Sequence, residues 1–435
     1  MEPVVRLAGR FVSVCGTIMD ALRAPGEPSL ACLVVDETNA APIGRNAPYS
    51  GRGFGVAREE TAATAMGEAF ERYSLLGLDD ELTGRASVAE LTRQAVPHLS
   101  PARLLGLADG GRQGAFAPIP TLEQPMLWVE SSHLVTGVRT LVPARYCMMI
   151  DETESGRAAN EGHWYRATSN GAATATTPER ACLGGTFELL ERDAFMLMWY
   201  HRLRFPFLTV APPSRLGRRV AAAVGSARLE LRLIDLSEVH DVPVVIGAVR
   251  GDVGGDTQIG IGGGADTTLA EAAWKAAKEA IAFYAWQRKQ IARGTVRAVN
   301  THEEVRDFME HAMYYMDRDN QRQLDFLFDD PPTRRPPVPE RADLTGPYAT
   351  VLSRLVRHLH GRGIDLYAVD LTPRGAAALG LCTYKVLSPD LIPLDCDHES
   401  RHLSQERLRT EPLRRGWRLD DQGIEGLNHV PHPFP

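Results

Sequence analysis

Apolar residues recur every three or four positions in three long segments, which is the spacing of one helix face. The first segment covers residues 57–78. In the second, a threonine and Pro178 stand directly before the periodic run and mark the start of a helix that extends to Tyr200. In the third, Thr268 with a glutamate three residues later forms a capping box, so a long helix follows. A shorter helix is predicted over residues 302–316.

Shorter apolar runs bounded by glycine or proline predict strands around these helices. Two of them lie within the first 43 residues. The predicted strand segments are VVRLAGRFVSV, LACLVVD, LWVESSHLVTG, TLVPARYCMMI, RLELRLIDL, VPVVIGAVR, IDLYAVDLT and CTYKVLS. Strands, long helices and then strands again indicate an α+β, or mixed α/β, fold in which sheets pack against helices.

Glycine, proline and charge interrupt this pattern at four places. Residues 44–55, GRNAPYSGRGFG, are predicted to be a glycine-rich loop, and residues 260–265, GIGGGA, a turn into a helix. GIGGGA also matches the dinucleotide fingerprint G-x-G-x-x-A, but no βαβ unit with a later acidic residue accompanies it. Residues 317–347 are dominated by charge and proline and are predicted to be an exposed or disordered loop. Residues 395–402, DCDHESRH, lack zinc-like spacing to other ligands and are predicted to be a solvated polar loop.

These interruptions suggest a division of the chain into three parts. We expect an N-terminal strand segment over residues 1–43 and a catalytic domain over residues 44–400 that includes the charged loop. A C-terminal extension with a proline-rich tail completes the chain over residues 401–435.

Composition excludes several classes of protein. The chain has 435 residues, of which 44% are hydrophobic, so a sizeable core is expected. The net charge of −7 argues against a nucleic-acid-binding protein, because such proteins carry a basic footprint. No apolar run is long enough for a membrane span, and the acidic, proline-containing start is not a signal peptide. The six cysteines are widely separated, which favours a reduced, cytoplasmic protein in which Cys147 and Cys182 are packed in the core.

Two predicted helices each carry a pair of glutamates followed by an arginine. The first reads TAMGEAFERYS and contains Glu68 and Glu71, and the second reads GGTFELLERDA and contains Glu188 and Glu191. Residues three apart on a helix share a face, with Cβ atoms roughly 5–6 Å apart. If the two helices pack together, four carboxylates converge and repel one another. A cation relieves that repulsion, and oxygen-only ligands suit Mg2+, Ca2+ or Mn2+.

A solvated charged face is the commoner meaning of a single Glu-x-x-Glu-Arg. Two facts favour a metal site here: the pairs stand among Ala, Phe, Leu and Gly, and the same order occurs twice. Arg72 and Arg192, next to the pairs, have the planar donors that bind phosphate oxygens. A di-iron bundle is disfavoured because it needs Glu-x-x-His, and none of these four glutamates has a histidine three residues later. No Walker A motif occurs, so any ATP site is of another kind.

The chain resembles the YcaO superfamily through several motifs over residues 45–395, together with the tail. The family pattern Ser-x-x-x-Glu-x-x-Glu-Arg is met with Thr64 in place of serine. Its S-N-G-x-A stretch is met at residues 169–173, its E-x-x-E-R-D-A helix at residues 188–194, and its G-K-G with Arg52 in place of lysine. The late segment YAVDLTPRGAAALGLCTYKVLSPDL is also similar, and the ending PHPFP resembles the Pro-x-Pro-x-Pro tail of the azoline-forming branch.

The resemblance implies a YcaO-like fold whose long helices form an ATP and Mg2+ site without a P-loop. The implied magnesium ligands are Glu68, Glu71, Glu188 and Glu191. The implied nucleotide-binding residues are Arg52, Thr64, Arg72, Ser169, Asn170, Thr176, Arg192 and Glu279. The sequence departs from the family pattern at Ala175 and Thr176, where Gly-Asn is usual, and at Ala282, where glutamine is usual. These departures concern residues expected near the nucleotide and leave the four implied magnesium ligands unchanged.

The activity that the resemblance implies is ATP-dependent cyclodehydration of a ribosomally made precursor peptide. A Cys, Ser or Thr side chain attacks the preceding carbonyl, the oxyanion takes a phosphoryl group from ATP, and loss of phosphate leaves a thiazoline or oxazoline. The stiff tail would deliver the terminal carboxylate of Pro435 for proton transfer or for ordering the site. Thioamide or amidine formation, and a non-catalytic scaffold that kept the fold, are the alternatives.

Partners follow from the same resemblance. No leader-peptide-binding domain is recognisable, so we expect a separate partner that resembles a ubiquitin-activating enzyme. A flavin-dependent dehydrogenase would act later in such a pathway, although nothing in the sequence shows it. A homodimer with an isologous interface is the default expectation for an oligomer.

Overall fold

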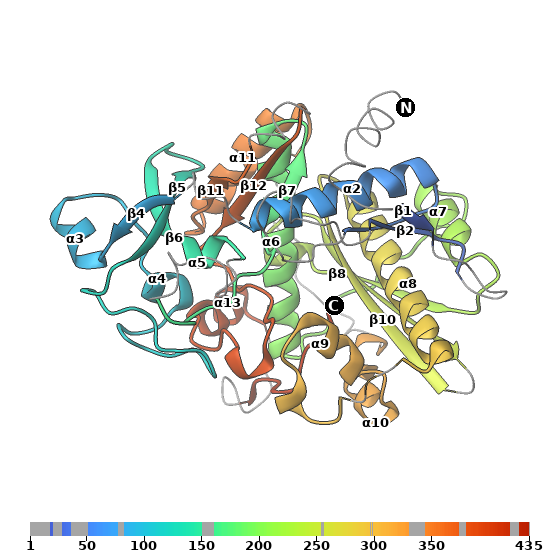
Figure 1. Ribbon diagram of the computed structural model, residues 1–435. Coiled ribbons are helices and arrows are strands. Elements are labelled where there is room, and N and C mark those ends of the chain that lie inside the picture. Colours follow the sequence, from blue (N-terminus) through green and yellow to red (C-terminus); the bar gives the residue numbers. More distant parts are fainter. Residues whose placement is uncertain are drawn as a thin grey trace.

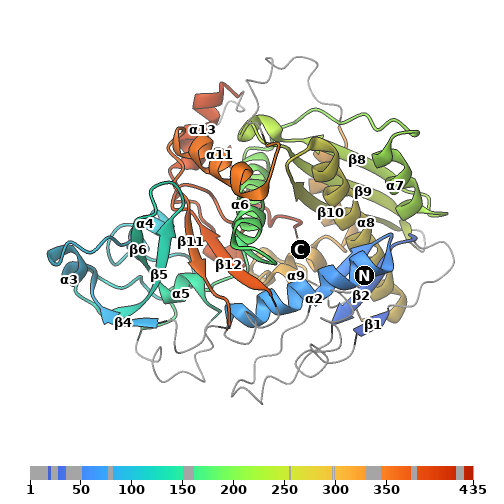
Figure 2. The same ribbon diagram turned by 90° about the horizontal axis from the view of Figure 1, so that it is seen from above.

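Helices and antiparallel sheets alternate along the chain, which confirms the predicted mixed fold, with 41% of the chain helical and 19% in strands. The computed structural model describes residues 18–20, 28–35, 51–76, 82–149, 161–253, 256–295, 297, 299–329, 344–373, 380–417 and 426–434. Helix α6 (Pro178–Tyr200) lies at the centre, with one sheet on each side of it (Figures 1 and 2).

The largest sheet described has the strand order β4-β5-β11-β12-β7, with β6 paired to β5. All of its pairings are antiparallel. Its strands are β4 (Leu82–Ala86), β5 (Met126–His133), β6 (Arg139–Pro143), β7 (Ala172–Ala175), β11 (Tyr367–Asp370) and β12 (Cys382–Leu387). Helix α6 packs on β12 and β7, so this sheet fixes one side of the central helix.

The second sheet has the order β10-β9-β8 and supports helix α8 (Leu269–Arg293). Its strands are β8 (Glu230–Asp235), β9 (Val244–Val253) and β10 (Asp256–Ala265). Helix α8 lies along β10 and β9, and α7 (Arg215–Val224) packs on α8 (Figure 1). Thr268 caps α8 by accepting from the Glu271 N–H, as the sequence predicted.

The predicted turn at residues 260–265 is wrong, because these residues form the second half of β10. The glycines serve close packing between the strand and α8. A Cβ at Gly260, Gly262 or Gly264 would overlap the backbone of α8. Sequence patterns associate such glycines with turns, but here their small size lets a helix approach a strand.

A small sheet of order β1-β2-β3 packs against helix α2 (Arg58–Leu75). Its strands are β1 (Ile18–Asp20), β2 (Ala31–Val35) and β3 (Gly51–Gly55). The predicted loop over residues 44–55 is wrong for residues 51–55, which are β3, and residues 44–50 lie outside the described residues. A Cβ at Gly51 or Gly53 would overlap the backbone of α2, so glycine again allows close packing.

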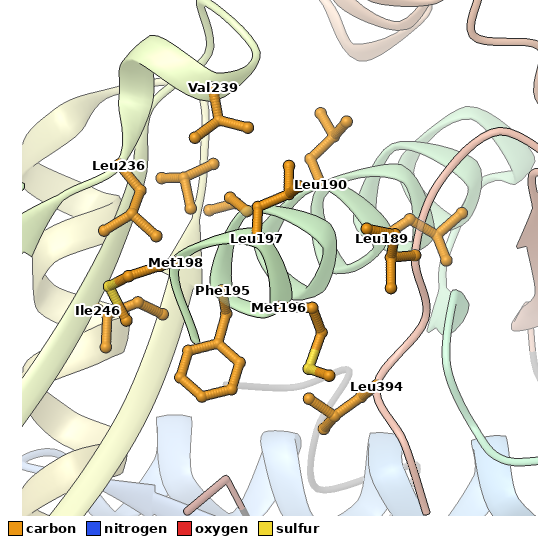
Figure 3. Close-up of a cluster of buried hydrophobic side chains, with 14 of the residues drawn as sticks. Leu189, Leu190, Phe195, Met196, Leu197, Met198, Leu236, Val239, Ile246 and Leu394 are labelled. Atoms are coloured by element: carbon orange, nitrogen blue, oxygen red, sulfur yellow. The ribbon is translucent and has the colours of Figure 1, made fainter. Parts of the chain in front are cut away.

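Helix α6 is buried on nearly all sides and forms the middle of the main core. Thr177 caps it and Pro178 is its first residue, as predicted. Its apolar side chains reach Leu236, Val239 and Ile246 on one side and Leu394 on another (Figure 3). A helix that is apolar all round belongs in the interior. Charged residues on such a helix therefore require a local explanation.

The segment from residue 302 to residue 329 differs from its prediction. The predicted helix over residues 302–316 is two pieces, η4 (His302–Glu304) and α9 (Phe308–Tyr314), because Thr301 and Asp307 each cap a new start. The expected exposed loop begins instead with α10 (Arg318–Gln321) and η5 (Arg322–Leu327). Three apolar side chains of this part are buried: Leu324, Leu327 and Phe328. Residues 330–343 lie outside the described residues.

The predicted solvated loop at residues 395–402 is also wrong, because Asp395, His398, Ser400 and His402 are buried. Their polar atoms are used inside the protein, where Asp395 accepts from Tyr200 and from His402. The strand predicted over residues 140–150 ends at Pro143 and continues as a short helix, α5. Cys147 and Cys182 are buried, as expected.

The remaining described elements are all helical. They are α3 (Val88–Arg93), α4 (Pro101–Leu105), α5 (Ala144–Cys147), η3 (Ser237–Val239), α11 (Tyr348–His360), η6 (His398–Ser400) and α13 (Arg407–Arg415). None of the helices that the structure describes has both the length and the apolar character needed to cross a bilayer.

Candidate active site

Three helices each place a glutamate against a backbone N–H of the strand or turn that precedes the helix in sequence. The helices are α2, α6 and α8. The three hydrogen bonds run from Arg52 N to Glu68 Oε2 at 2.9 Å, from Gly171 N to Glu188 Oε2 at 2.7 Å and from Gly263 N to Glu279 Oε2 at 2.8 Å. The same local arrangement therefore occurs three times, and each occurrence fixes one carboxylate.

The Gly171 turn shows how tightly these units are packed. Gly171 has φ of 77°, a conformation that side chains other than glycine rarely adopt. A Cβ there would overlap the Val386 carbonyl, and a Cβ at Gly185 of α6 would overlap the Gly171 carbonyl. The turn and the helix are thus in direct contact, which brings the Gly171 N–H to the Glu188 carboxylate.

The glutamates of the three helices form one electrostatic cluster. Burial raises the pKa of Glu71 well above its usual range, and the nearby Glu188 and Glu68 carboxylates raise it further. Burial, with Glu279 as the next cause, raises the pKa of Glu191 to about 8. Burial also raises the pKa of Glu279. The four glutamates expected to converge do so, and Glu279 is the fifth member of the cluster.

Two arginines partly neutralise this charge. Arg72 binds Glu68 and Arg192 binds Glu188, each with a nitrogen–oxygen distance of 2.8 Å. Arg192 also donates to Asn170 Oδ1 at 2.7 Å. The Asn170 side chain itself donates to the Leu394 carbonyl at 3.3 Å. Arg192 is therefore held in place from two sides.

The other predicted nucleotide-binding residues lie around the cluster with fewer contacts. Arg52 uses its backbone N–H and is exposed, and Thr64 is exposed one turn before Glu68, where its hydroxyl donates to the Glu60 carbonyl. Ser169 is half-buried beside Asn170. Thr176 is exposed at the far end of β7, and no hydrogen bond joins it to the glutamates among the described residues. Pro435 lies outside the described residues.

The sequence did not single out Lys385, a buried lysine on β12 close to the cluster. Its ammonium donates to the Thr168 carbonyl at 2.6 Å. Burial lowers its pKa, while Cys147, Glu188 and Glu71 act in the opposite direction. It borders a small cavity that Asn170 and Tyr165 also line. A single lysine within the apolar strand CTYKVL is the sequence signal that could have indicated it.

Phe434, near the end of the chain, also belongs to this site. Its ring centroid is 4.8 Å from that of Phe195, and the Arg192 guanidinium carbon is 5.9 Å from the ring centroid. A Cβ placed on Gly263 would overlap both the Glu191 carboxylate and the Phe434 ring, so these two side chains meet above Gly263.

The donor set of the cluster fits a hard divalent cation. The cluster brings together five carboxylates from three helices, and burial first and neighbouring carboxylates next raise the pKa values of Glu71 and Glu191. Carboxylate oxygens are the ligands that Mg2+ prefers, usually together with substrate phosphates. The residues present therefore fit Mg2+ with a phosphate-bearing ligand.

A family model described as YcaO cyclodehydratase, ATP- and Mg2+-binding, matches residues 52–392. This match confirms the predicted family and the predicted cofactors, ATP and Mg2+. The matched range contains all five glutamates of the cluster. No curated protein sequence matches the chain.

Solved structures share the fold at low sequence identity. A heterocyclase in complex with substrate and cofactor has a TM-score of 0.74 and 21% identity, covering 100% of this chain and 57% of its own. YcaO from Methanopyrus kandleri, bound with AMPPCP and Mg2+, has a TM-score of 0.63 and 17% identity, covering 92% and 93%. The E. coli microcin synthetase McbBCD complex with pro-MccB17 bound has a TM-score of 0.57 and 14% identity, covering 86% and 88%. The chain thus spans just over half the length of the first of these proteins.

Proposed function

The chain belongs to the YcaO family, and on this premise we propose that it catalyses ATP-dependent cyclodehydration of a ribosomally made precursor peptide. The proposed products are thiazolines from Cys residues and oxazolines from Ser or Thr residues. In each event one side-chain heteroatom bonds to the preceding carbonyl carbon, and the carbonyl oxygen leaves on the phosphate. The YcaO cyclodehydratase family is a family of enzymes, and azoline formation is the reaction that we propose for this member.

The convergence of five carboxylates from α2, α6 and α8 is the observation that carries this proposal. We assign Glu68, Glu71, Glu188 and Glu191 to Mg2+, which would neutralise charge on the phosphate groups of the bound nucleotide. We assign Glu279 to the nucleotide side of the site, together with Arg52, Thr64, Ser169 and Thr176. The contacts of Arg52 with Glu68 and of Gly263 with Glu279 support the assignment of Arg52 and Glu279, whereas that of Thr64, Ser169 and Thr176 rests on the family motifs.

Arg72 and Arg192 would stabilise the negative charge of the transferring group. Arg192 is suited to this because Glu188 and Asn170 hold its guanidinium in one orientation. Such preorganised donors contribute most where charge develops in the transition state. We further propose that the terminal carboxylate of Pro435 takes part in proton transfer or orders the site, since Phe434 directly before it contacts the Arg192 and Glu191 region.

The proposed partners are the precursor peptide and a separate leader-binding protein that resembles a ubiquitin-activating enzyme. The microcin synthetase McbBCD complex, which has pro-MccB17 bound, contains a chain with this fold. This likeness supports a peptide substrate and partner proteins. Four further predictions from the sequence remain proposals. They are a flavin-dependent dehydrogenase in the same pathway, a homodimer, a cytoplasmic location and the division of the chain into three parts at residues 43 and 400.

Phosphate release and peptide mass test the function together. The purified chain is given Mg-ATP with and without a candidate precursor peptide and its leader-binding partner. Cyclodehydration predicts peptide-dependent phosphate release and the loss of one water from the peptide per event. Phosphate release without that mass loss would indicate thioamide chemistry or a missing partner, and no turnover in any combination would indicate a scaffold.

A further inference from the structure

Buried side chains of two helical elements bind the backbone of the segment from residue 426 to residue 434. Three consecutive carbonyls each accept from a different buried side chain. These hydrogen bonds run from Trp199 Nε1 to Val430 O at 3.1 Å, from Tyr315 Oη to Pro431 O, and between His311 Nδ1 and His432 O at 2.8 Å. Upstream, the Asn428 N–H donates to the Tyr200 carbonyl at 2.7 Å.

The donors come from two elements that both contact the segment. Trp199 is on α6, while His311 is on α9 and Tyr315 is the residue that ends α9. The Trp199 and Tyr315 rings are in edge contact, with their centroids 6.3 Å apart. A proline-rich strand has no internal hydrogen bonds, so its carbonyls must be satisfied from outside when it is buried. Aromatic grooves with N–H and O–H donors recognise such segments elsewhere.

The His432 side chain fixes the end of the segment. Its Nδ1 accepts from the Phe434 N–H at 3.3 Å, so its Nε2 carries the proton and donates to the Asp395 carbonyl at 2.8 Å. Its ring is stacked on the His311 ring with centroids 3.9 Å apart. Both ring nitrogens are used, and the turn they stabilise directs Phe434 to Phe195 and Arg192.

We propose that His311 and Tyr315 are positioning residues that seat the C-terminal segment and thereby hold Phe434 against Arg192 and Glu191. The catalytic part of this inference rests on the proposed function, whereas the seating itself does not. The assignment of the glutamates to Mg2+ and the nucleotide does not involve His311 or Tyr315, because no described contact joins either side chain to the cluster. They act on the site only through the segment between them and Phe434.

The test uses conservative variants that remove one donor and keep the ring. Tyr315→Phe removes the hydroxyl that reaches Pro431, and His311→Phe removes the Nδ1 donor but preserves a stackable ring. His429→Ala is the matched control, because His429 is an exposed histidine of the same segment whose hydrogen bond to Arg401 lies in solvent, unlike the buried ones of His311 and Tyr315. Thermal unfolding of each purified full-length variant establishes that it is folded.

Hydrogen exchange of residues 426–434 measures the seating without any turnover. One lost hydrogen bond should speed this exchange by about threefold to tenfold, and the double variant should exceed either single one. His429→Ala should leave the exchange unchanged. If the double variant exchanges as slowly as the wild type, the seating role is wrong.

Kinetics measure the link from the segment to the site. The double variant should lower kcat for peptide-dependent phosphate release by about tenfold or more, while KM for the peptide changes little, because the groups around Arg192 are displaced. Faster exchange with unchanged kcat would overturn the proposal. If the wild type itself releases no phosphate, the proposed function fails. The link from the segment to the site is then tested by the affinity for a nonhydrolysable Mg-ATP analogue. Weaker binding by the double variant than by the wild type supports the proposal, and equal binding refutes it.

Discussion

The backbone N–H of Gly263 on β10 donates to the Glu279 carboxylate on α8 at 2.8 Å. The same relationship joins Gly171 to Glu188 and Arg52 to Glu68. On α2 and α6 a second glutamate follows three residues after the bound one, whereas on α8 the residue three after Glu279 is Ala282. The site is therefore built from three related strand–helix units, of which the third contributes one carboxylate rather than two.

Replacing Glu191 by glutamine should abolish turnover without destabilising the fold. Burial and the nearby Glu279 raise the pKa of Glu191 to about 8 and so disfavour its ionised form, and glutamine keeps the size of the side chain without that charge. We expect peptide-dependent phosphate release to fall by about a hundredfold or more, while the melting temperature stays equal or rises. Glu123→Gln, at an exposed position, is the control and should match the wild type in both measurements. Activity within twofold of wild type in Glu191→Gln would exclude this glutamate from the reaction.

Replacing Asn170 by alanine should weaken the site through Arg192. The variant removes the acceptor that holds the Arg192 guanidinium at 2.7 Å. Hydrogen bonds to charged groups contribute about 1.5–3 kcal/mol, so kcat/KM for ATP should fall by about tenfold or more. Steady-state kinetics with varied ATP measures this, and an unchanged kcat/KM would show that Arg192 does not depend on Asn170.

Replacing Gly263 by alanine should disturb the site sterically. The added Cβ would overlap the Glu191 carboxylate and the Phe434 ring, so both must move. We expect loss of activity and faster hydrogen exchange of residues 426–434. Gly361→Ala is a control, because a Cβ there meets its neighbours at ordinary van der Waals distance. If Gly263→Ala retains activity and protection, the packing described above Gly263 does not matter for function.

The fold should lose stability in mild acid because of buried neutral histidines. Burial lowers the pKa of His311 to about 4 and that of His398 to about 3. Below about pH 6.5 the unfolded chain takes up a proton at each of these positions, whereas the folded chain does not until the lower pKa is reached. The stability that each histidine contributes is therefore complete above about pH 6.5 and is lost progressively as the pH falls toward the folded pKa.

Denaturant unfolding at several pH values measures this effect. Each histidine should contribute about 1.4 kcal/mol per pH unit between these limits. The variant His311→Phe should show a shallower dependence than the wild type. Identical pH slopes for the two proteins would contradict the prediction.

The sequence predicted those parts of the fold that depend on neighbours along the chain. Pro178 and the apolar periodicity after it located α6, and Thr268 located the start of α8. The glycines of β10 were wrongly predicted to form a turn. They are needed because α8 packs closely along the strand, and no local sequence pattern records that contact. Residues 395–402 looked solvated because the groups that bury them, Tyr200 and the C-terminal segment, are far away in sequence.

The same distinction holds for the site. Spacing on single helices was enough to pair Glu68 with Glu71 and Glu188 with Glu191. The place of Glu279 among them rested on family resemblance, and in the structure Gly263 lies against both Glu279 and Glu191. Lys385 and Phe434 were missed because they reach the cluster only through sheet pairing and through the return of the chain end to α6.

The most direct test of the proposed reaction follows the oxygen atom that leaves the peptide. A precursor peptide is prepared with heavy oxygen in the backbone carbonyls that precede its Cys, Ser and Thr residues. It is then incubated with the chain, Mg-ATP and the leader-binding partner. Cyclodehydration by phosphorylation of the carbonyl oxygen predicts that the released phosphate carries one heavy oxygen for each azoline formed. Unlabelled phosphate, with the heavy oxygen retained in the peptide, would contradict the account.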